Sequence, residues 1–331
     1  MKTELRFAVL DVGARYGLHP TWTRLQHLVD FDLFEPDPIE SKHLRFLYLK
    51  NPGIRTFPLA LGAEPGIVRV RQAQHRGLTS QFSSDQTFFT GHRYVDEPLL
   101  EDTFLEIQVD RLDAIDDRKR YTFFKIDVEG AEYEVLLGAQ QSLANGVLGV
   151  RAEVQFHQMF RGSALFGDVD SLMRDSGFEL LNFDYRGLGK CASPFVPDQV
   201  GGQLLSTDAV WIRPLSRIMD GEFGEVSSTS LRMAIFLLLN GASDLSAYLL
   251  SEVKAGGADF ASFSEDPLYV FLKNEFALMG KRLSYVPQFD MARFIDFFHN
   301  VFDEGYPERH EFWHQVSLIP DMHRDLGLQR N

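Results

Sequence analysis

Short apolar runs alternate with amphipathic segments through the first two thirds of the chain. Runs of this kind are typical of strands that are buried on both faces, and they predict strands over residues 7–12, 31–34, 54–61, 67–70, 104–109, 121–128, 150–154, 178–183 and 209–212. Helical spacing follows residue 20 and recurs over residues 41–49, 131–143 and 169–175. This alternation predicts an α/β fold with a mostly parallel sheet covered by helices.

The pattern changes after Arg213-Pro214, where helical periodicity takes over. It predicts helices over residues 230–253, 268–279, 291–302 and 311–318. We therefore expect two domains, residues 1–214 and residues 215–331. The helical second domain is expected either to handle substrate or to oligomerise, with a homodimer through this tail as the simplest form.

Composition excludes several classes of protein. The formal net charge of −14 argues against nucleic acid as the main partner, because phosphate binding needs clustered Lys and Arg. The single cysteine, Cys191, excludes an internal disulfide framework. The N-terminus has no apolar signal segment, and the most apolar helix is far shorter than the roughly 20 residues that span a bilayer. We expect a cytoplasmic protein without membrane insertion.

The first strand ends in a glycine-containing turn, Asp11-Val12-Gly13-Ala14-Arg15-Tyr16-Gly17. Its glycines permit a tight turn and close approach of a ligand to the backbone. The spacing differs from the dinucleotide pattern, and the leading acid suits a ligand with an ammonium and a sulfonium better than one with a pyrophosphate. Glu35 ends the second strand, where a carboxylate about 20 residues after the turn can accept hydrogen bonds from ribose hydroxyls. Together these residues predict an adenosine site.

The strand over residues 121–128 closes on two acids, Asp127 and Glu129, and ligands of open α/β sheets bind at such strand ends. The string from Lys125 to Ala139 (K-I-D-V-E-G-A-E-Y-E-V-L-L-G-A) resembles the FkbM-type methyltransferase family. With the glycine turn and residues 34–38, 60–62 and 109–115, the resemblance covers residues 5–213. It implies a Rossmann-like class I methyltransferase sheet with a reversed last strand, S-adenosyl-L-methionine as cofactor, and methyl transfer to oxygen on a hydroxylated small molecule or glycan. Arg15 departs from the family, which usually has Asn there, and places a positive charge near a cationic ligand.

The resemblance assigns the cofactor to ten residues, which are Asp11, Gly13, Ala14, Arg15, Gly17, Glu35, Pro36, Ala60, Leu61 and Asp127. Asp127 is predicted to be the base or the group that orients the acceptor, with Glu129 assisting, since the two share one face of a strand end. Stabilisation by the dipole of the following helix is the structural alternative. His157 is a further candidate base, because its ordinary pKa lies near neutrality. Lys125 is expected either to neutralise the acids or to contact substrate. Residues 71–102 show little periodicity and are predicted to form a functional loop, in which Thr79-Ser80-Gln81 is expected to touch the cofactor carboxylate or the acceptor. No metal is predicted.

The tail contains a rival motif, His310-Glu311-Phe312-Trp313-His314. On a helix its two imidazoles would share a face suited to zinc. The position six residues after His314 is Pro320, so the third ligand of a metzincin is missing. An amphipathic helix is the favoured interpretation, and a zinc hydrolase is the remote one. The nearer alternative to a methyltransferase is a non-catalytic binding or assembly module with the same fold.

Overall fold

The computed structural model describes residues 4–73, 79–91, 100–115, 121–184, 187–189, 202–284, 288–303 and 305. The chain forms two compact units. One contains residues 7–214, and the other contains residues 215–331 together with residues 1–6. In the second unit the backbone of Leu5 is held at both ends, because its N–H donates to Asp266 Oδ2 at 3.0 Å and its carbonyl accepts from Arg232 Nε at 3.1 Å. The N-terminal residues therefore belong with the helices.

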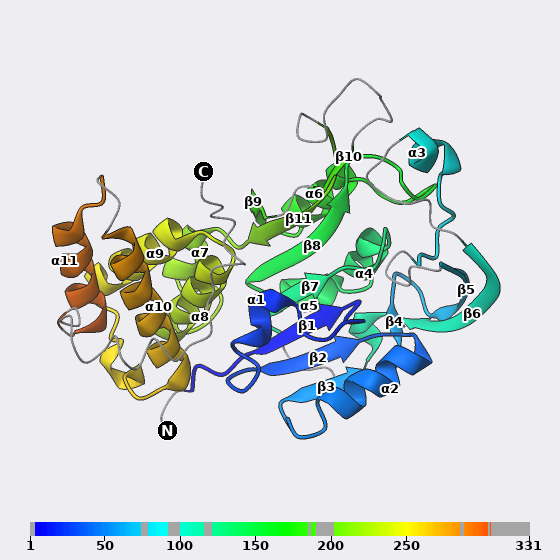
Figure 1. Cartoon of the computed structure of the whole chain (residues 1–331). Helices are drawn as coiled ribbons and strands as arrows, with labels where there is room; N and C mark the ends of the chain where they lie inside the picture. Colours follow the sequence, from blue (N-terminus) through cyan, green and yellow to red (C-terminus); the bar gives the residue numbers. More distant parts are fainter. Residues whose placement is uncertain are drawn as a thin grey trace. The chain divides into compact units, whose positions relative to one another are not determined.

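A single sheet forms the centre of the first unit (Figure 1). Its order is β10-β11-β8-β7-β1-β2-β3, built from Gly187–Gly189, Gln203–Ile212, Gly149–Gln155, Phe123–Ile126, Ala8–Val12, Asp30–Phe34 and Ile54–Phe57. The strands from β8 to β3 are parallel, and β11 runs antiparallel to β8. A further strand, β9 (Glu179–Phe183), pairs with the second half of β11, on the edge where β10 pairs with the first half. The predicted α/β sheet with a reversed last strand is confirmed.

Two predicted elements of this unit are each divided in two. The strand expected over residues 54–61 is β3 and the separate β4 (Ala60–Leu61), because Pro58 has no N–H to donate to a ladder. The helix expected over residues 131–143 is α4 (Glu132–Leu137) and α5 (Gln140–Ala144). The break falls at Gly138, where a Cβ would lie 2.0 Å from the carbonyl oxygen of Gly62. Only glycine allows this close approach of two backbones.

The other helices of the unit are α1 (Pro20–Thr23), α2 (Pro38–Leu47), α3 (Gln86–Gly91) and α6 (Phe166–Asp175), with a 3₁₀ turn over Leu112–Ala114. Asp37 caps α2, since its Oδ1 accepts hydrogen bonds from the Ile39 and Glu40 N–H groups. Pro38 follows at the first helical position, which needs no N–H. The chain therefore leaves the end of β2 along a fixed path.

A second sheet lies between β3 and β7 in sequence. Its order is β4-β6-β5, with β5 over Gly66–Ala73 and β6 over Leu100–Asp110. The stretch from residue 71 to 102, expected to be a loop, therefore contains the end of β5, the helix α3 and the start of β6. Figure 1 shows this small sheet beyond the carboxyl ends of β1 and β2.

The two faces of the central sheet differ in polarity. One face is apolar, and Leu10, Phe124, Val150 and Trp211 pack there in one core. On the opposite face Asp11, Lys125 and Arg151 stand side by side in register on β1, β7 and β8. Arg151 Nη2 lies 2.5 Å from Asp184 Oδ2 and 2.6 Å from Asp208 Oδ2. Since buried charges are tolerated only when paired, this polar row fixes how the strands and their flanking loops meet.

The second unit is helical, as the periodicity predicts. Its helices are α7 (Leu215–Met219), α8 (Val226–Leu239), α9 (Ser243–Ala255), α10 (Pro267–Leu283) and α11 (Met291–Phe302), with a 3₁₀ turn over Ala261–Phe263. The helix expected over residues 230–253 is divided at Asn240-Gly241, where Gly241 has φ +80°. The expected helix over residues 311–318, and the motif at residues 310–314, lie outside the described residues. No helix in the described part of the chain is long and apolar enough to cross a membrane.

Candidate functional site

The glycine turn brings the ends of β1, β2 and β7 into close contact. The N–H groups of Gly13 and Ala14 donate to the Phe34 carbonyl at 3.0 and 3.2 Å, and the Asp127 N–H donates to the Val12 carbonyl at 3.0 Å. Gly13 has φ +79°, and a Cβ at this position would lie 1.7 Å from the Asp127 carbonyl oxygen. A side chain there would push β1 and β7 apart, so the geometry of these strand ends depends on glycine.

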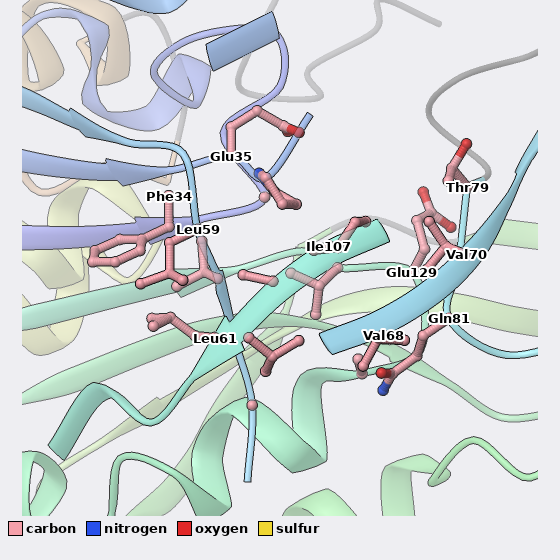
Figure 2. A pocket seen from close by; sticks show the side chains of 18 of the residues that line it. Phe34, Glu35, Leu59, Leu61, Val68, Val70, Thr79, Gln81, Ile107 and Glu129 are labelled. Atoms are coloured by element: carbon pink, nitrogen blue, oxygen red, sulfur yellow. The ribbon is translucent and has the colours of Figure 1, made fainter. Parts of the chain in front are cut away.

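A cavity of about 340 Å³ opens above these strand ends. Its walls include eight of the residues predicted for the site, which are Gly13, Arg15, Glu35, Pro36, Ala60, Leu61, Asp127 and Glu129. Thr79 and Gln81 also line it. Figure 2 shows Glu35 apart from Glu129 and Thr79, with apolar side chains between them. Among the predicted residues, Asp11, Ala14, Gly17 and His157 do not line this cavity.

One wall of the cavity comes from the small sheet. Its apolar side chains alternate along β5 and β6, and they are Val68, Val70, Leu105, Ile107 and Val109. Sequence analysis predicts strands here but assigns them no role at the site. The spacing of two residues does carry a signal, because it places all five side chains on one face of a two-stranded ribbon.

Glu35 is nearly buried, with 4% of its surface exposed. Its Oε1 accepts a hydrogen bond of 2.8 Å from the Asp37 N–H, and burial raises its pKa. Arg15 Nη2 lies 2.8 Å from Asp37 Oδ2 and 3.9 Å from Glu35 Oε1. The positive charge that departs from the family pattern is therefore neutralised within the protein.

Lys125 lies between two acids. Its Nζ is 3.4 Å from both Asp11 Oδ1 and Asp127 Oδ2. Burial lowers the pKa of Lys125, but the charges of Asp11 and Asp127 outweigh it and the pKa is raised. Asp11 is fully buried, its Oδ2 accepts from the His19 N–H at 3.4 Å, and burial raises its pKa. Of the two interpretations of Lys125, the geometry matches charge neutralisation.

The turn after β7 is held by side chains on two sides. Glu129 and Gly130 both have positive φ, +55° and +99°, which is unusual for a glutamate. The Glu132 carboxyl accepts hydrogen bonds from the N–H groups of Val128 (2.8 Å) and Gly130 (3.1 Å). Ser80 Oγ donates to the Glu129 carbonyl at 2.6 Å. The strained turn is thus stabilised by contacts outside its own backbone.

Three carboxylates converge beside this turn. One oxygen from each of Asp127, Glu129 and Glu153 lies within 4.8 Å of the other two. Burial, and then the charge of Asp127, raise the pKa of Glu129 well above its ordinary value. Burial and the charge of Glu129 do the same for Glu153. Carboxylates this close repel one another when all are charged, so the arrangement favours a shared proton or a bound divalent cation.

His157 lies elsewhere. Its Nε2 is in hydrogen-bond contact with the Gln203 amide nitrogen, and its ring stacks on Phe88 with centroids 6.2 Å apart. His157 is also absent from the lining of the cavity. The structure therefore places this candidate base outside the cavity wall.

Glu134 is a cavity residue that sequence analysis misses. It stands in the first turn of α4 and lines the cavity, and its Oε2 is inaccessible to solvent and accepts no hydrogen bond from the described residues. The sequence shows only an acid two positions after Glu132. The sequence does not show whether Glu132 or Glu134 lines the cavity, because this depends on how the segment after β4 packs against α4.

Comparison with known proteins identifies a family. The model of the methyltransferase FkbM domain matches residues 11–180. Among solved structures, methyltransferase FkbM from Methylobacillus flagellatus is 15% identical to this chain. The alignment covers 64% of this chain and 44% of that chain, with a TM-score of 0.37. A TehB-like S-adenosylmethionine-dependent methyltransferase from Corynebacterium glutamicum is 14% identical. That alignment covers 63% of this chain and 80% of the other, with a TM-score of 0.31. Magnesium protoporphyrin IX methyltransferase from Synechocystis, solved with its bound cofactor, is 9% identical, with coverages of 63% and 70% and a TM-score of 0.32.

The chain thus spans less than half the length of the Methylobacillus protein. No curated protein matches it. The assignment rests on the match over residues 11–180, which covers the glycine turn, Glu35 and the β7 turn, and on the order of the strands in the central sheet. The cofactor of this family is S-adenosylmethionine, and the chain belongs to the FkbM methyltransferase family.

Proposed function

We propose that the protein transfers a methyl group from S-adenosylmethionine to a hydroxyl group of a sugar, glycan or natural-product acceptor. The observation that supports this most directly is the cavity, with Glu35 in one part of its wall and Asp127 and Glu129 in another. The apolar side chains between these acids come from β4, β5 and β6. The cavity therefore offers a carboxylate for a ribose diol, apolar surface for a purine, and acids beside the methyl-donating end, where the acceptor binds.

The charges in the cavity suit a cationic ligand. Arg15 is paired with Asp37, so the turn offers no free guanidinium to a phosphate. At Gly13 a Cβ would lie 1.7 Å from the Asp127 carbonyl oxygen, so glycine keeps the ends of β1 and β7 together beside the cavity. When bound, S-adenosylmethionine supplies a methyl group already activated by its sulfonium. What remains for the protein is to orient the acceptor and take up its proton.

In our proposal the two acids of the β7 turn have different roles, because Asp127 takes up the proton and Glu129 orients the acceptor. Asp127 is ion-paired with Lys125 and accepts the proton of the acceptor hydroxyl at an Oδ atom. Glu129 lies beside Asp127 and Glu153, burial raises its pKa, and it holds the acceptor by hydrogen bonds. Holding the acceptor in line with the methyl group accounts for roughly 7–11 kcal/mol of barrier reduction. His157 is the less favoured base, because it does not line the cavity.

Calorimetric titration with S-adenosylmethionine, followed by mass-spectrometric product detection in a panel of sugars and hydroxylated natural products, tests the function. We expect saturable cofactor binding and a product heavier by one methylene unit. Failure to bind the cofactor at millimolar concentration would sink the proposal. Binding without a product from any hydroxylated acceptor would favour the non-catalytic module.

The variant Asp127→Asn tests the assigned base. It keeps the shape of the side chain but not its basicity, so kcat should fall about 10²- to 10⁴-fold while the cofactor Kd changes little. Asp244→Asn, on the exposed first turn of α9, is the matched control and should retain full activity. If Asp127→Asn turns over at the wild-type rate, Asp127 is not the base.

A further inference from the structure

Large apolar side chains gather on the surface of α2. Of the ten large hydrophobic side chains that are exposed in the described part of the chain, five lie on or beside this helix, and they are Tyr16, Ile39, Phe46, Leu47 and Leu49. We call these five residues the α2 face. Apolar residues scattered singly over a surface are ordinary, whereas a group of them on one element marks an interaction surface.

The spacing of these residues places them on the outer side of the helix. Ile39 and Phe46 are two turns apart and are 78% and 77% exposed, so they project from the same side. The inner side carries Ser41 and Leu44, which are buried. Figure 1 shows α2 beside β3, which ends the strand order of the central sheet. The apolar side chains of α2 therefore project outward at the margin of this unit.

The glycine turn extends the α2 face towards the cavity. Arg15 Nη2 lies 2.8 Å from Asp37 Oδ2 at the start of α2, and the Leu18 N–H donates to Tyr48 Oη at 2.9 Å at its end. The turn therefore runs alongside the helix. Tyr16 lies between these two contacts, and it also lines the cavity. The α2 face thus adjoins the candidate site.

The charge around the α2 face is opposite to that of the whole chain. Residues 38–50 contain three basic residues, Lys42, Arg45 and Lys50, and one acid, Glu40, whereas the formal net charge of the chain is −14. All three basic residues are exposed. Lys42 is about one turn from both Ile39 and Phe46, so it lies between them on the helix. Apolar side chains among basic ones complement an anionic surface with an apolar interior.

We propose that the α2 face docks the protein on the surface of an anionic lipid bilayer. The three basic side chains lie at the lipid headgroups, and Ile39 and Phe46 reach the boundary of the acyl chains. The helix lies in the plane of the interface and does not cross the bilayer. A second copy of the chain fits this face less well, because a symmetric dimer would bring the same basic side chains of both copies together. Docking requires no cofactor, so the proposal is independent of the proposed function.

Cosedimentation with lipid vesicles tests the proposal. One set of vesicles is phosphatidylcholine alone, and the other contains phosphatidylcholine and phosphatidylglycerol in equal amounts. The protein should bind the mixed vesicles at low ionic strength, bind them more weakly as salt is added, and bind the neutral vesicles far less. Lys42→Gln and Arg45→Gln should each weaken binding to the mixed vesicles about fivefold. Phe46→Ser should weaken it about tenfold, because an apolar side chain no longer leaves water.

Ile67→Ser and Arg293→Gln are the matched controls. Ile67 on β5 is 73% exposed, and the side chain of Arg293 on α11 is 88% exposed. The two variants remove the same kinds of side chain from other parts of the surface, so they should bind the mixed vesicles as the wild type does. Far-ultraviolet circular dichroism establishes that each variant is folded.

Three outcomes would overturn the docking proposal. In the first, the wild type does not bind the mixed vesicles, or it binds neutral vesicles equally well. In the second, the control variants lose as much binding as Phe46→Ser and Arg45→Gln, so that binding does not depend on α2. In the third, ultracentrifugation shows a dimer that Phe46→Ser abolishes, which makes a second copy the occupant of this face.

The same proteins separate this inference from the proposed function. A wild type that binds S-adenosylmethionine in calorimetry but no vesicles refutes the docking alone. A wild type that binds the mixed vesicles but no S-adenosylmethionine refutes the proposed function alone.

Discussion

Two glutamates in the first turn of α4 face two different regions of the molecule. Glu132 reaches back to the β7 turn and accepts hydrogen bonds from the Val128 and Gly130 N–H groups. Glu134, two positions later, points away from Glu132 because successive helical residues are about 100° apart. It lines the cavity, and the described residues give its Oε2 no hydrogen bond. The same residue type thus holds a turn together in one place and lines a cavity in the other. The two side chains differ both in hydrogen bonding and in burial, since Glu132 is 4% exposed whereas Glu134 is only partly buried.

Removing Glu132 should give the largest effect on stability. Glu132→Ala leaves the Val128 and Gly130 N–H groups without an acceptor, next to a glutamate at positive φ. We expect the free energy of unfolding to fall by about 2–4 kcal/mol in urea titrations. Glu132→Gln keeps one acceptor oxygen and should lose roughly half as much. If the Glu132→Ala protein were as stable as the wild type, Glu132 would not stabilise the β7 turn and would not differ from Glu134 in this respect.

The pH dependence of stability should distinguish Glu132 as well. Burial raises its pKa from the ordinary 4.5 to about 8. Because the folded state binds this proton more tightly than the unfolded chain, the contribution of Glu132 to stability is complete below pH 4.5 and is lost as the pH rises through 8. Between about pH 5 and pH 9 the wild type should therefore lose more stability than Glu132→Gln, by a few kcal/mol. Urea midpoints across this range measure the difference, and parallel curves for the two proteins would contradict it.

Ser80 supports the same turn from the other side, with a smaller expected effect. Its Oγ donates to the Glu129 carbonyl and accepts from the Phe82 N–H. Ser80→Ala should lower the free energy of unfolding by about 1 kcal/mol, measured by urea titration. Ser83→Ala, at a more exposed position of the same segment, is the control. If Ser80→Ala destabilised the protein as much as Glu132→Ala, then Ser80 would contribute at least as much as Glu132 to the stability of the β7 turn.

Glu134 should show the smallest effect, with the opposite sign. Glu134→Gln replaces a carboxylate in which one buried oxygen has no hydrogen bond from the described residues, so the protein should keep its stability or gain up to about 1 kcal/mol. Thermal unfolding of the ligand-free protein measures this. A clear loss of stability would show that Glu134 supports the fold, as Glu132 does.

The central sheet could be predicted because its strands are apolar runs of the right length between turn residues. Gly13, Glu35 and Asp127 could be placed at one edge, since the carboxyl ends of parallel strands meet there. The end of β3 at Phe57 was not predicted, although the local sequence explains it. Pro58 follows directly and has no N–H to donate to a neighbouring strand.

The remaining features depend on contacts between distant parts of the chain. The break at Gly138 depends on Gly62, and the hold on the β7 turn depends on Ser80, 49 residues away. Pairing of Lys125 with Asp11 and Asp127 depends on the register of β1 against β7. Such information is not present in the local pattern of residues, so the neutral role of Arg15 and the cavity position of Glu134 became visible only in the structure.

The small sheet β4-β6-β5 is one continuous stretch of chain, and its two ends are neighbours. Leu61 at the end of β4 pairs with Asp110 at the end of β6, and the Gly62 N–H donates to the Asp110 carbonyl at 3.0 Å. A segment that leaves and returns at one place can be exchanged without disturbing what lies on either side. The segment from β4 to β6, which forms a wall of the cavity, can therefore be exchanged as a unit. Grafting the corresponding segment of another family member onto this chain would change the cavity while Gly13, Glu35 and Asp127 keep their places.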